Sequence, residues 1–297
     1  MSAKNQLLEL LTRYGGNPRC LASITGESSR VIAKEILEMQ RNHHLTIFPA
    51  VFSEGLGLGK YLILARDCPI KYETASKLFH PIMNLFRGDM ESNLFSITLF
   101  AEGETVDNVL EALRSISCSL VITSTIKQTR KFVRDPRCYD FKFHRWTCDD
   151  KLEIRPGEVL ENPHEQDTMG VVQLQVNPFT DIRLINHRKH VFKIVTGFMY
   201  SLGKSDFVVQ VISKEDITEE FPEVMWTAIG EDIFISELHV DRKRLEVVME
   251  KVRDKAMETI IAPKSPLYAL GYSLPYEIFR EGRWVYPRIE VSRAKTG

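Results

Sequence analysis

The stretch that most constrains this 297-residue chain is residues 17–45, NPRCLASITGESSRVIAKEILEMQRNHHL. A short apolar-spaced segment ends at Gly26, where a glycine commonly terminates a helix. Ser28 or Ser29 can then cap a longer helix over residues 28–43. The apolar residues of this longer segment recur at helical spacing: Ile32, Ile36 and Met39. The stretch therefore predicts a short helix, a tight turn and a longer helix with one buried stripe.

The unit continues on both sides of this stretch. Leucines at positions 7, 8, 10 and 11 predict a helix before it. Residues 46–52 and 60–65 predict two strands after it, with the glycine-rich GLGLG at 55–59 as the hairpin turn between them. Three helices followed by a two-stranded wing make a winged helix-turn-helix, which we assign to residues 1–59.

Residues 60–126 show a different order of elements. Apolar patterning predicts one helix over 72–86, kinked at Pro81, and a second over 105–116. Four strands are predicted around these helices, at 60–65, 87–90, 94–100 and 120–125. The resulting βαββαβ order is that of a ferredoxin-like domain.

Charge is distributed unevenly along the next segment, residues 127–168. Residues 127–145 hold seven Lys or Arg against two Asp or Glu, with aromatic residues interleaved. This pattern fits either an arm that contacts nucleic acid or a connecting strand with core aromatics, and we favour the strand. Residues 149–168 are acidic and contain Pro156, Gly157 and Pro163, which indicates an interdomain linker.

The remaining residues, 169–297, are expected to form a C-terminal α+β domain. Strands are predicted at 170–176, 207–212 and 232–240, and helices at 190–202 and 242–257. A hairpin is expected to turn at Glu281 and Gly282, followed by a basic tail that frays. The element order allows a second ferredoxin-like unit, so the whole chain is expected to be an α+β protein.

The N-terminal part resembles a known family of regulators. Residues 23–66, SITGESSRVIAKEILEMQRNHHLTIFPAVFSEGLGLGKYLILAR, resemble the Lrp/AsnC family of transcription regulators in the turn, the apolar-spaced helix and the GLGLG segment. The resemblance covers about the first 126 residues and implies a winged helix joined to a ferredoxin-like domain that dimerises and often binds an amino acid. Residues 88–93, GDMESN, depart from the family's turn before the third strand, so an amino-acid ligand is not expected.

The resemblance places the longer helix in the major groove of double-stranded DNA. Side chains at its N-terminal end would meet base edges, and basic residues around it would meet phosphates. The residues expected to bind DNA are Arg19, Ser28, Ser29, Arg30, Lys34 and Arg41.

The composition of the chain indicates the cellular compartment in which the protein is expected. The five cysteines are scattered, no run of about 18 apolar residues exists, and the N-terminus does not have the form of a signal peptide. These features predict a cytoplasmic protein with reduced thiols and no membrane contact. The net charge of −1 conceals an N-terminal excess of cations, with eight Lys or Arg against five Asp or Glu over residues 1–66.

Two groups of residues have the chemistry of metal ligands but lack a specific ligand spacing. Cys138, His144 and Cys148 fall within eleven residues, and His187 and His190 lie three apart. We assign neither group to a metal and expect no cofactor. The sequence also contains no nucleophile elbow, P-loop or dinucleotide fingerprint.

The function predicted from these features is that of a sequence-specific DNA-binding regulator, not an enzyme. It would act as a homodimer, with the C-terminal domain sensing an unidentified effector or a partner. Two alternatives remain open. Siroheme decarboxylases, which resemble the same regulators, act on a tetrapyrrole in a pocket of His and Arg, and this chain offers His80, His144, His187 and His190. A winged-helix adaptor that binds proteins is the third possibility.

Overall fold

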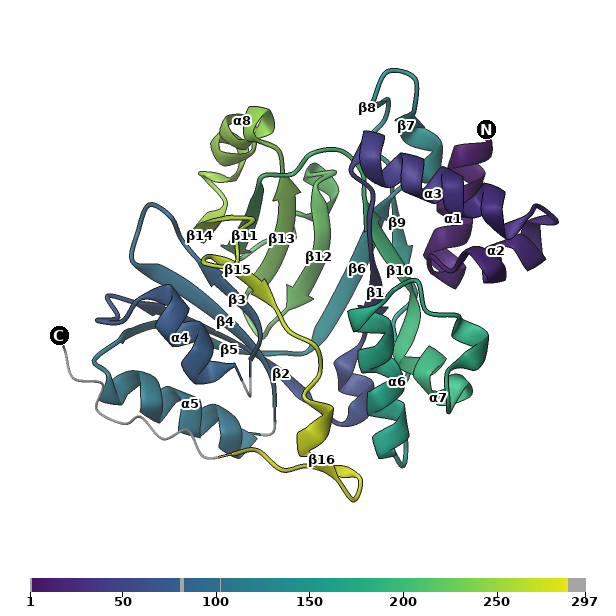
Figure 1. Ribbon diagram of the computed structural model, residues 1–297. Helices are drawn as coiled ribbons and strands as arrows, with labels where there is room; N and C mark the ends of the chain where they lie inside the picture. The colour runs from purple at the N-terminus through teal and green to yellow at the C-terminus, as the bar shows by residue number, and fades with distance from the viewer. Residues whose placement is uncertain (1, 81–82, 102, 288–297) are drawn as a thin grey trace.

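The structure, a computed structural model, describes residues 2–80, 83–101 and 103–287. The strands form two larger sheets, one of five strands and one of six, and the helices pack around these sheets (Figure 1). The predicted α+β class is therefore confirmed.

Three helices open the chain: α1 (Ala3–Tyr14), α2 (Pro18–Thr25) and α3 (Ser29–His43). The side chain of Asn17 accepts hydrogen bonds from the first amides of α2, and Gly26 ends that helix in the left-handed region at φ 78°. Ser28 caps α3 by accepting from the amide of Val31. The predicted helix-turn-helix is confirmed because its caps lie where the sequence indicated.

The predicted pairing of the two wing strands is wrong. Strand β1 (Thr46–Val51) pairs antiparallel with β10 (Val195–Ser201), from the other half of the chain. Strand β2 (Gly59–Arg66) instead belongs to the five-stranded sheet. The glycine-rich segment forms a short 3-10 turn, Ser53–Leu56, ended by Gly57 at φ 79°. A local turn signal could not reveal a partner strand so distant in sequence.

The five-stranded sheet contains the predicted ferredoxin-like unit. Its elements are β2, α4 (Tyr72–Phe79), β3 (Met83–Gly88), β4 (Leu94–Ala101), α5 (Gly103–Ser115) and β5 (Ser119–Ile126). The sheet order is β15-β3-β4-β2-β5, with β15 (Ala269–Gly271) added at one edge. The predicted helix over 72–86 is too long, because residues 83–88 form β3; the expected kink at Pro81 lies outside the described residues.

The six-stranded sheet contains a second ferredoxin-like unit. Its elements are β11 (Phe207–Ser213), β12 (Val224–Ile229), β13 (Phe234–Val240), α8 (Arg242–Val252) and β14 (Ala256–Pro263). The order β14-β11-β13-β12 reproduces the order β5-β2-β4-β3 of the first unit. A 3-10 turn, Thr218–Glu220, stands where the first unit has α4.

Residues 128–154, which follow the first unit, add two strands to the second sheet and form a separate two-stranded hairpin. The strands of this segment are β6 (Gln128–Arg134), β7 (Tyr139–Asp140), β8 (Arg145–Trp146) and β9 (Lys151–Ile154). Strand β6 pairs with both β12 and β9. Phe132 and Tyr139 are buried, as expected of a connecting strand, whereas Phe143 is exposed.

Two sequence predictions before the second unit are wrong. Residues 170–176 lie in a helix, α6 (Glu165–Val176), because Val171 and Leu174 recur at helical spacing and are both buried. The predicted helix over 190–202 is α7 (Arg188–Ile194) followed by β10. Helices α6 and α7 thus precede β10 as α2 and α3 precede β1, so the fold repeats the same order of elements twice.

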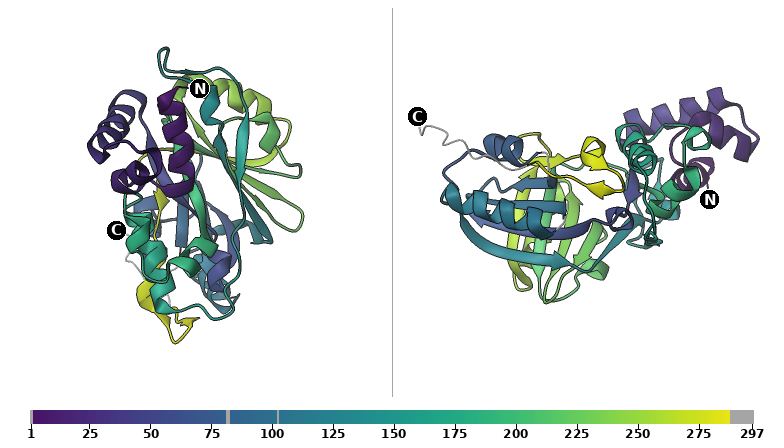
Figure 2. Two further views of the ribbon diagram at one scale, coloured as in Figure 1. Left: turned by 90° about the vertical axis from the view of Figure 1, so that its right-hand side faces the viewer. Right: turned by 90° about the horizontal axis from the view of Figure 1, so that it is seen from below.

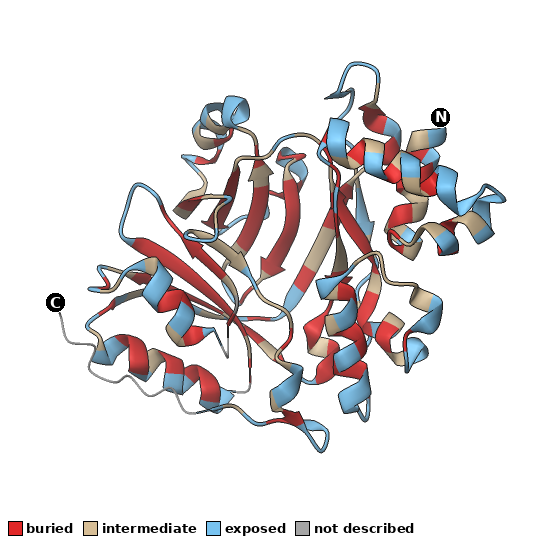
Figure 3. Ribbon diagram, viewed as in Figure 1, coloured by how far each residue is buried: buried red, intermediate tan, exposed pale blue. Residues whose placement is uncertain are grey.

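The two large sheets pack face to face (Figure 2). One apolar cluster contains Leu62 and Leu64 of β2 together with Ile235 of β13 and Ile260 of β14. Helices α4 and α5 cover the outer face of the first sheet, and α8 covers the second, which leaves the strands largely buried (Figure 3). The inner face of the first sheet, which a second copy of the domain could otherwise cover, is covered by the second unit of the same chain. A homodimer stays a prediction.

The chain ends with a small hairpin, β16 (Phe279–Arg280) and β17 (Arg283–Trp284). Glu281 and Gly282 have positive φ values of 51° and 77°, which confirms the predicted turn. The basic tail that we expected to fray lies outside the described residues from position 288 onwards. Among the helices that the structure describes, none has an apolar run long enough to cross a bilayer.

Four of the five cysteines form disulfides, in contrast to the reduced thiols that we predicted. Cys68 pairs with Cys118, and Cys138 pairs with Cys148. The remaining cysteine, Cys20, is buried, and burial raises the pKa of its thiol. The spacing in the sequence did not indicate these pairs, since the first joins the end of β2 to the end of α5.

Candidate functional site

Two cavities share residues where the sheets meet the β1–β10 ribbon. The small cavity has a volume of about 340 Å³ and is lined by residues of both sheets and of the ribbon. The large cavity, of about 810 Å³, is lined by the β7–β8 hairpin, the end of β10 and the start of α8. Met225 and His239 line both, so the cavities are neighbours. Both volumes are in the range of small-molecule binding sites.

Polar side chains link the two sheets beside the small cavity. Glu237 and His239 lie two residues apart on β13 and therefore share one face of the strand. Arg87 of β3 donates from Nε to Glu237 Oε2 at 3.0 Å, and its Nη2 forms an ion pair with the same oxygen at 2.9 Å. His239 Nε2 lies 3.4 Å from Glu237 Oε1, and its Nδ1 lies 3.1 Å from Lys264 Nζ. The row Lys264–His239–Glu237–Arg87 is thus connected throughout.

Burial determines the charges in this row. The side chains of Arg87 and Glu237 are 8% and 5% exposed. Burial alone would raise the pKa of Glu237, but the charge of Arg87 and the hydrogen bonds from His239 and Arg87 outweigh it and hold this pKa at about 2. Burial also lowers the pKa of His239, although Glu237 opposes the shift. At neutral pH we therefore assign an ionised Glu237 and a neutral His239, which donates from Nε2 and accepts from Lys264 at Nδ1.

Two lysines line the same small cavity. Lys60 is 3% exposed, and its ammonium donates to Thr129 Oγ1 at 3.1 Å. The centroids of the Trp226 and Phe100 rings lie 4.7 and 5.3 Å from Lys60 Nζ. Burial, with the nearby charge of Lys131, lowers the pKa of Lys60 from 10.5 to about 7. Burial lowers the pKa of Lys131 as well.

The small cavity thus has an excess of basic groups in an aromatic setting. Its lining holds three basic side chains, Lys60, Arg87 and Lys131, but Glu237 as its one carboxylate. Its other walls include several apolar or aromatic side chains: Phe48, Leu85, Phe100, Met199, Trp226 and Tyr272. An anionic ligand with a flat apolar body would satisfy both features.

The large cavity is also rich in cations. Six basic side chains line it: Arg134, Arg145, Lys204, Arg242, Lys243 and Arg244. Four acidic side chains are present, of which Asp149 pairs with Arg134 and Glu223 pairs with Arg244. The excess of basic side chains therefore extends from the small cavity to the large one.

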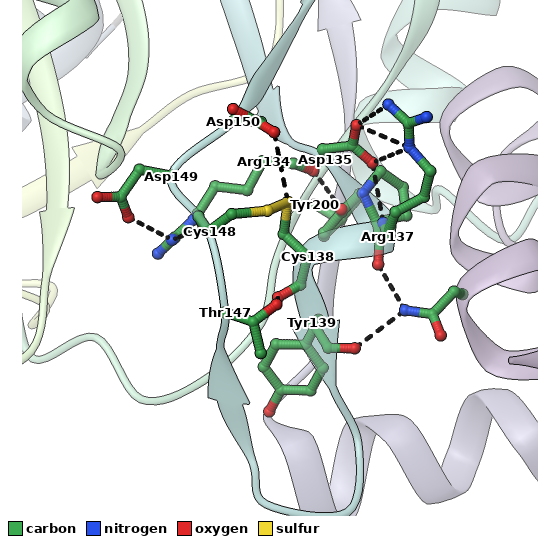
Figure 4. Close-up of a disulfide and its surroundings, with 12 residues drawn as sticks. Arg134, Asp135, Arg137, Cys138, Tyr139, Thr147, Cys148, Asp149, Asp150 and Tyr200 are labelled. Carbon is green, nitrogen blue, oxygen red and sulfur yellow. Dashed lines mark hydrogen bonds and ion pairs between the residues drawn. A yellow bond between two sulfur atoms is a disulfide. The ribbon is translucent and has the colours of Figure 1, made fainter. Parts of the chain in front are cut away.

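One wall of the large cavity is the β7–β8 hairpin, which a disulfide closes (Figure 4). The Cys138–Cys148 bond lies at the base of the hairpin, and Thr147 donates from N and Oγ1 to the carbonyl of Cys138 at 2.8 and 3.0 Å. The Arg134 guanidinium lies 4.1 Å from the centroid of the Trp146 ring and also donates to the carbonyl of Cys148. These contacts fix the hairpin against β6.

Removing each disulfide tests how far it stabilises the fold. Cys138 and Cys148 are separated by 10 residues, so replacing both by alanine is expected to cost about 2–3 kcal/mol of unfolding free energy. Cys68 and Cys118 are separated by 50 residues, and the same change there is expected to cost about 4 kcal/mol. Urea unfolding of both double variants measures these losses. Stability equal to that of the parent chain would contradict the loop-closure argument.

All six residues predicted to bind DNA are exposed: Arg19, Ser28, Ser29, Arg30, Lys34 and Arg41. They lie on α2 and α3 or at their ends, and none lines either cavity. The hydroxyl of Ser28 already accepts a hydrogen bond from the backbone of α3. Their part in DNA binding stays a prediction.

The histidines and cysteines considered as metal or tetrapyrrole ligands lie in different parts of the structure. Cys138 and Cys148 form a disulfide, whereas His144 stacks on His43 with a centroid distance of 4.3 Å and lines the large cavity. His187 and His190 both lie against the carboxylate of Asp167, away from the cavities. His80 is exposed.

Sequence reasoning missed the residues of the small cavity. Lys60, Arg87, Glu237 and His239 are charged or titratable residues within strands, where the pattern alone gives no partner. The one available signal was Glu237 and His239 in ISELHV, two polar residues on one face of an otherwise apolar strand. The ion pair between Arg87 of β3 and Glu237 of the other sheet becomes visible only in the folded structure.

Comparison with known proteins gives two solved structures. No protein-family model and no curated protein matches the chain. The chain is similar to the siroheme decarboxylase NirDL, with a TM-score of 0.48, 13% identity, and coverage of 93% of this chain and 96% of that one. A second structure of NirDL, in complex with an iron-uroporphyrin III analogue, gives a TM-score of 0.47, 12% identity, and coverage of 90% and 92%.

Proposed function

We propose that the chain binds a polycarboxylate of the tetrapyrrole class in the two cavities and removes carboxylate groups from it as CO2. The single observation that carries this proposal is the excess of basic side chains in two neighbouring cavities, one of which has aromatic walls. We thus prefer the decarboxylase, an alternative in the sequence analysis, to the DNA-binding regulator predicted there, and we propose that the protein is an enzyme.

Recognition would rest on charge and shape together. Arginine side chains bind carboxylates through two parallel hydrogen bonds, and lysines bind them as point charges. The basic residues of the large cavity would hold the peripheral carboxylates of the ligand. The rings of Phe48, Phe100 and Trp226 would contact the flat apolar macrocycle.

The reaction needs a carboxylate-bearing carbon and a proton donor. The bond between that carbon and the carboxyl group breaks, CO2 leaves as a neutral molecule, and the electron pair remains on the carbon, where the conjugated ring can delocalise it. A proton must then reach that carbon. Lys60 is suited to this step, because its pKa of about 7 makes its proton exchangeable at neutral pH. Lys131, which lines the same cavity, would keep a carboxylate of the substrate near Lys60.

The proposal predicts a loss of CO2 from iron uroporphyrin III or siroheme incubated with the protein. Mass spectrometry of the extracted tetrapyrrole measures the loss as successive decreases of one CO2. Lys60→Met is expected to slow the reaction by about 10²- to 10⁴-fold, the usual contribution of a general acid. Lys71→Met, at an exposed lysine before α4, is the matched control and should keep full activity. An unchanged substrate, or equal rates in both variants, would contradict the proposal.

A second candidate is the predicted DNA-binding regulator, favoured by the exposure of α3 and of the basic residues around it. In this case Arg30→Ala should weaken binding to a selected DNA site by roughly ten- to a hundredfold and leave non-specific binding nearly unchanged. Lys34→Ala should weaken both alike. Selection from a random DNA pool provides the site, and a pool without enrichment would count against this candidate.

A further inference from the structure

A cluster of two histidines and an aspartate joins α6 to α7, apart from the cavities. Asp167 lies in the first turn of α6 and is fully buried. Its Oδ1 lies 3.1 Å from His187 Nδ1 and 3.3 Å from His190 Nδ1. The three candidate ligand atoms lie within 4.8 Å of one another. Each side chain therefore contributes one candidate ligand atom to the same small region.

We propose that Asp167, His187 and His190 bind a divalent first-row transition metal ion, with zinc as the reference ion. Zinc takes imidazole nitrogen and carboxylate oxygen at about 2.0–2.2 Å, and two ligands of a tetrahedron at that radius lie roughly 3.3 Å apart. The distances from Asp167 Oδ1 to the two Nδ1 atoms match this separation. A set of two imidazoles and one carboxylate suits zinc, iron or cobalt better than magnesium or calcium.

The surroundings hold the three side chains in this arrangement. The amide of His164 donates to Asp167 Oδ2 at 2.7 Å, which orients the carboxylate, and His190 Nδ1 also lies 3.4 Å from this oxygen. His187, whose ring lies against Asp167, has φ 52°, in a region that non-glycine residues rarely adopt. Such a conformation persists only where the neighbouring structure enforces it.

The cluster is accessible to solvent on one side, as expected of a metal site with open coordination positions. The side chains of His187 and His190 are 37% and 43% exposed, whereas Asp167 is 0% exposed. A bound ion would therefore keep water or another ligand on its outer side. The ring centroid of His164 lies 5.6 Å from that of His187, so a third imidazole is near the site. The ion would link α6 to α7 ahead of the second ferredoxin-like unit.

The site can be tested with Co²⁺ added to the metal-free full-length protein without reductant, so that the disulfides remain closed. We expect one Co²⁺ per chain, the visible absorption of four-coordinate cobalt, and its displacement by Zn²⁺. His187→Ala and His190→Ala should each weaken Co²⁺ binding by at least about tenfold. Loss of a residue that only hydrogen-bonds to a ligand already lowers metal affinity by about tenfold or more, and loss of a ligand should lower it further. His80→Ala removes an exposed histidine elsewhere and is the matched control.

Three outcomes would overturn the proposal. The first is that the parent chain binds neither ion, which would leave the cluster as a hydrogen-bonded His–Asp–His network. The second is that the His187→Ala/His190→Ala double variant, shown to be folded by circular dichroism, binds Co²⁺ as the parent does. The third is a thiolate-to-cobalt absorption band, which would place the ion on cysteine instead. None of these outcomes depends on the proposed decarboxylation.

Discussion

Replacing Arg87 by methionine is expected to destabilise the protein by about 3–5 kcal/mol, because the change leaves the Glu237 carboxylate buried without its cation. Both side chains are less than a tenth exposed, so bulk water cannot fully solvate the carboxylate that remains. The double variant Arg87→Met/Glu237→Leu removes both charges and should recover most of this loss. The measurement is the free energy of unfolding in urea for all three variants.

Arg66→Met provides the matched control for this experiment. Arg66 also pairs across the two sheets, with Glu258 at 3.1 Å, but these side chains are 43% and 24% exposed. Loss of this pair is expected to cost no more than about 1 kcal/mol. If Arg87→Met costs as little as Arg66→Met, then Glu237 is not held as an ion between the sheets.

Replacing Lys60 by methionine is expected to stabilise the protein at neutral pH by about 2–4 kcal/mol. The unfolded chain holds the proton of this amine up to a pH of about 10.5, whereas the folded protein releases it near pH 7. Below pH 7 the folded state therefore carries a full penalty for the buried charge, and methionine removes it. The estimate allows for losing the hydrogen bond to Thr129.

The pH dependence gives this prediction its sign. Because the unfolded state binds the extra proton between pH 7 and 10.5, the parent chain gains stability as the pH rises through this window. The difference in unfolding free energy between Lys60→Met and the parent chain should then decrease by about 1.4 kcal/mol per pH unit. Urea unfolding at pH 7, 8 and 9, with Lys71→Met as control, measures this. A variant that is less stable than the parent at every pH would disprove the lowered pKa.

Together with the proposed loss of activity, this result would show why a lysine is kept at this position. A buried lysine that weakens the fold is expected where its proton is used, since active sites often hold groups with shifted pKa values at a cost in stability. A lysine with only a structural role should not combine higher stability with lower activity on replacement.

The sequence predicted the local features of the fold better than its long-range pairings. The caps at Asn17, Ser28 and Gly26 act within a few residues, so the helix-turn-helix could be placed closely. The partner of β1 is β10, and no local rule connects two strands so far apart. The segment 170–176 was misread because its β-branched residues suit a strand, whereas tertiary packing selects the helical pair Val171 and Leu174.

The candidate site was harder to predict than the fold, for a related reason. Its charged residues come from β2, β3, β6 and β13, which meet only when the two sheets pack together. Each of these residues, read alone, resembles an ordinary solvated side chain. His187 and His190 could be paired from their spacing, but Asp167, which completes the cluster, precedes them on another helix.

The central claim, that the cavities bind a polycarboxylate tetrapyrrole, is tested most directly by an absorbance titration of the protein with iron uroporphyrin III. We predict saturable one-to-one binding. Three basic side chains of the large cavity, Arg145, Arg242 and Lys243, have no ion pair among the described residues. Their joint replacement by glutamine should weaken binding by at least about a thousandfold, since charge-assisted hydrogen bonds contribute about 1.5–3 kcal/mol each. Absence of binding, or equal affinity of the parent and the triple variant, would contradict the account.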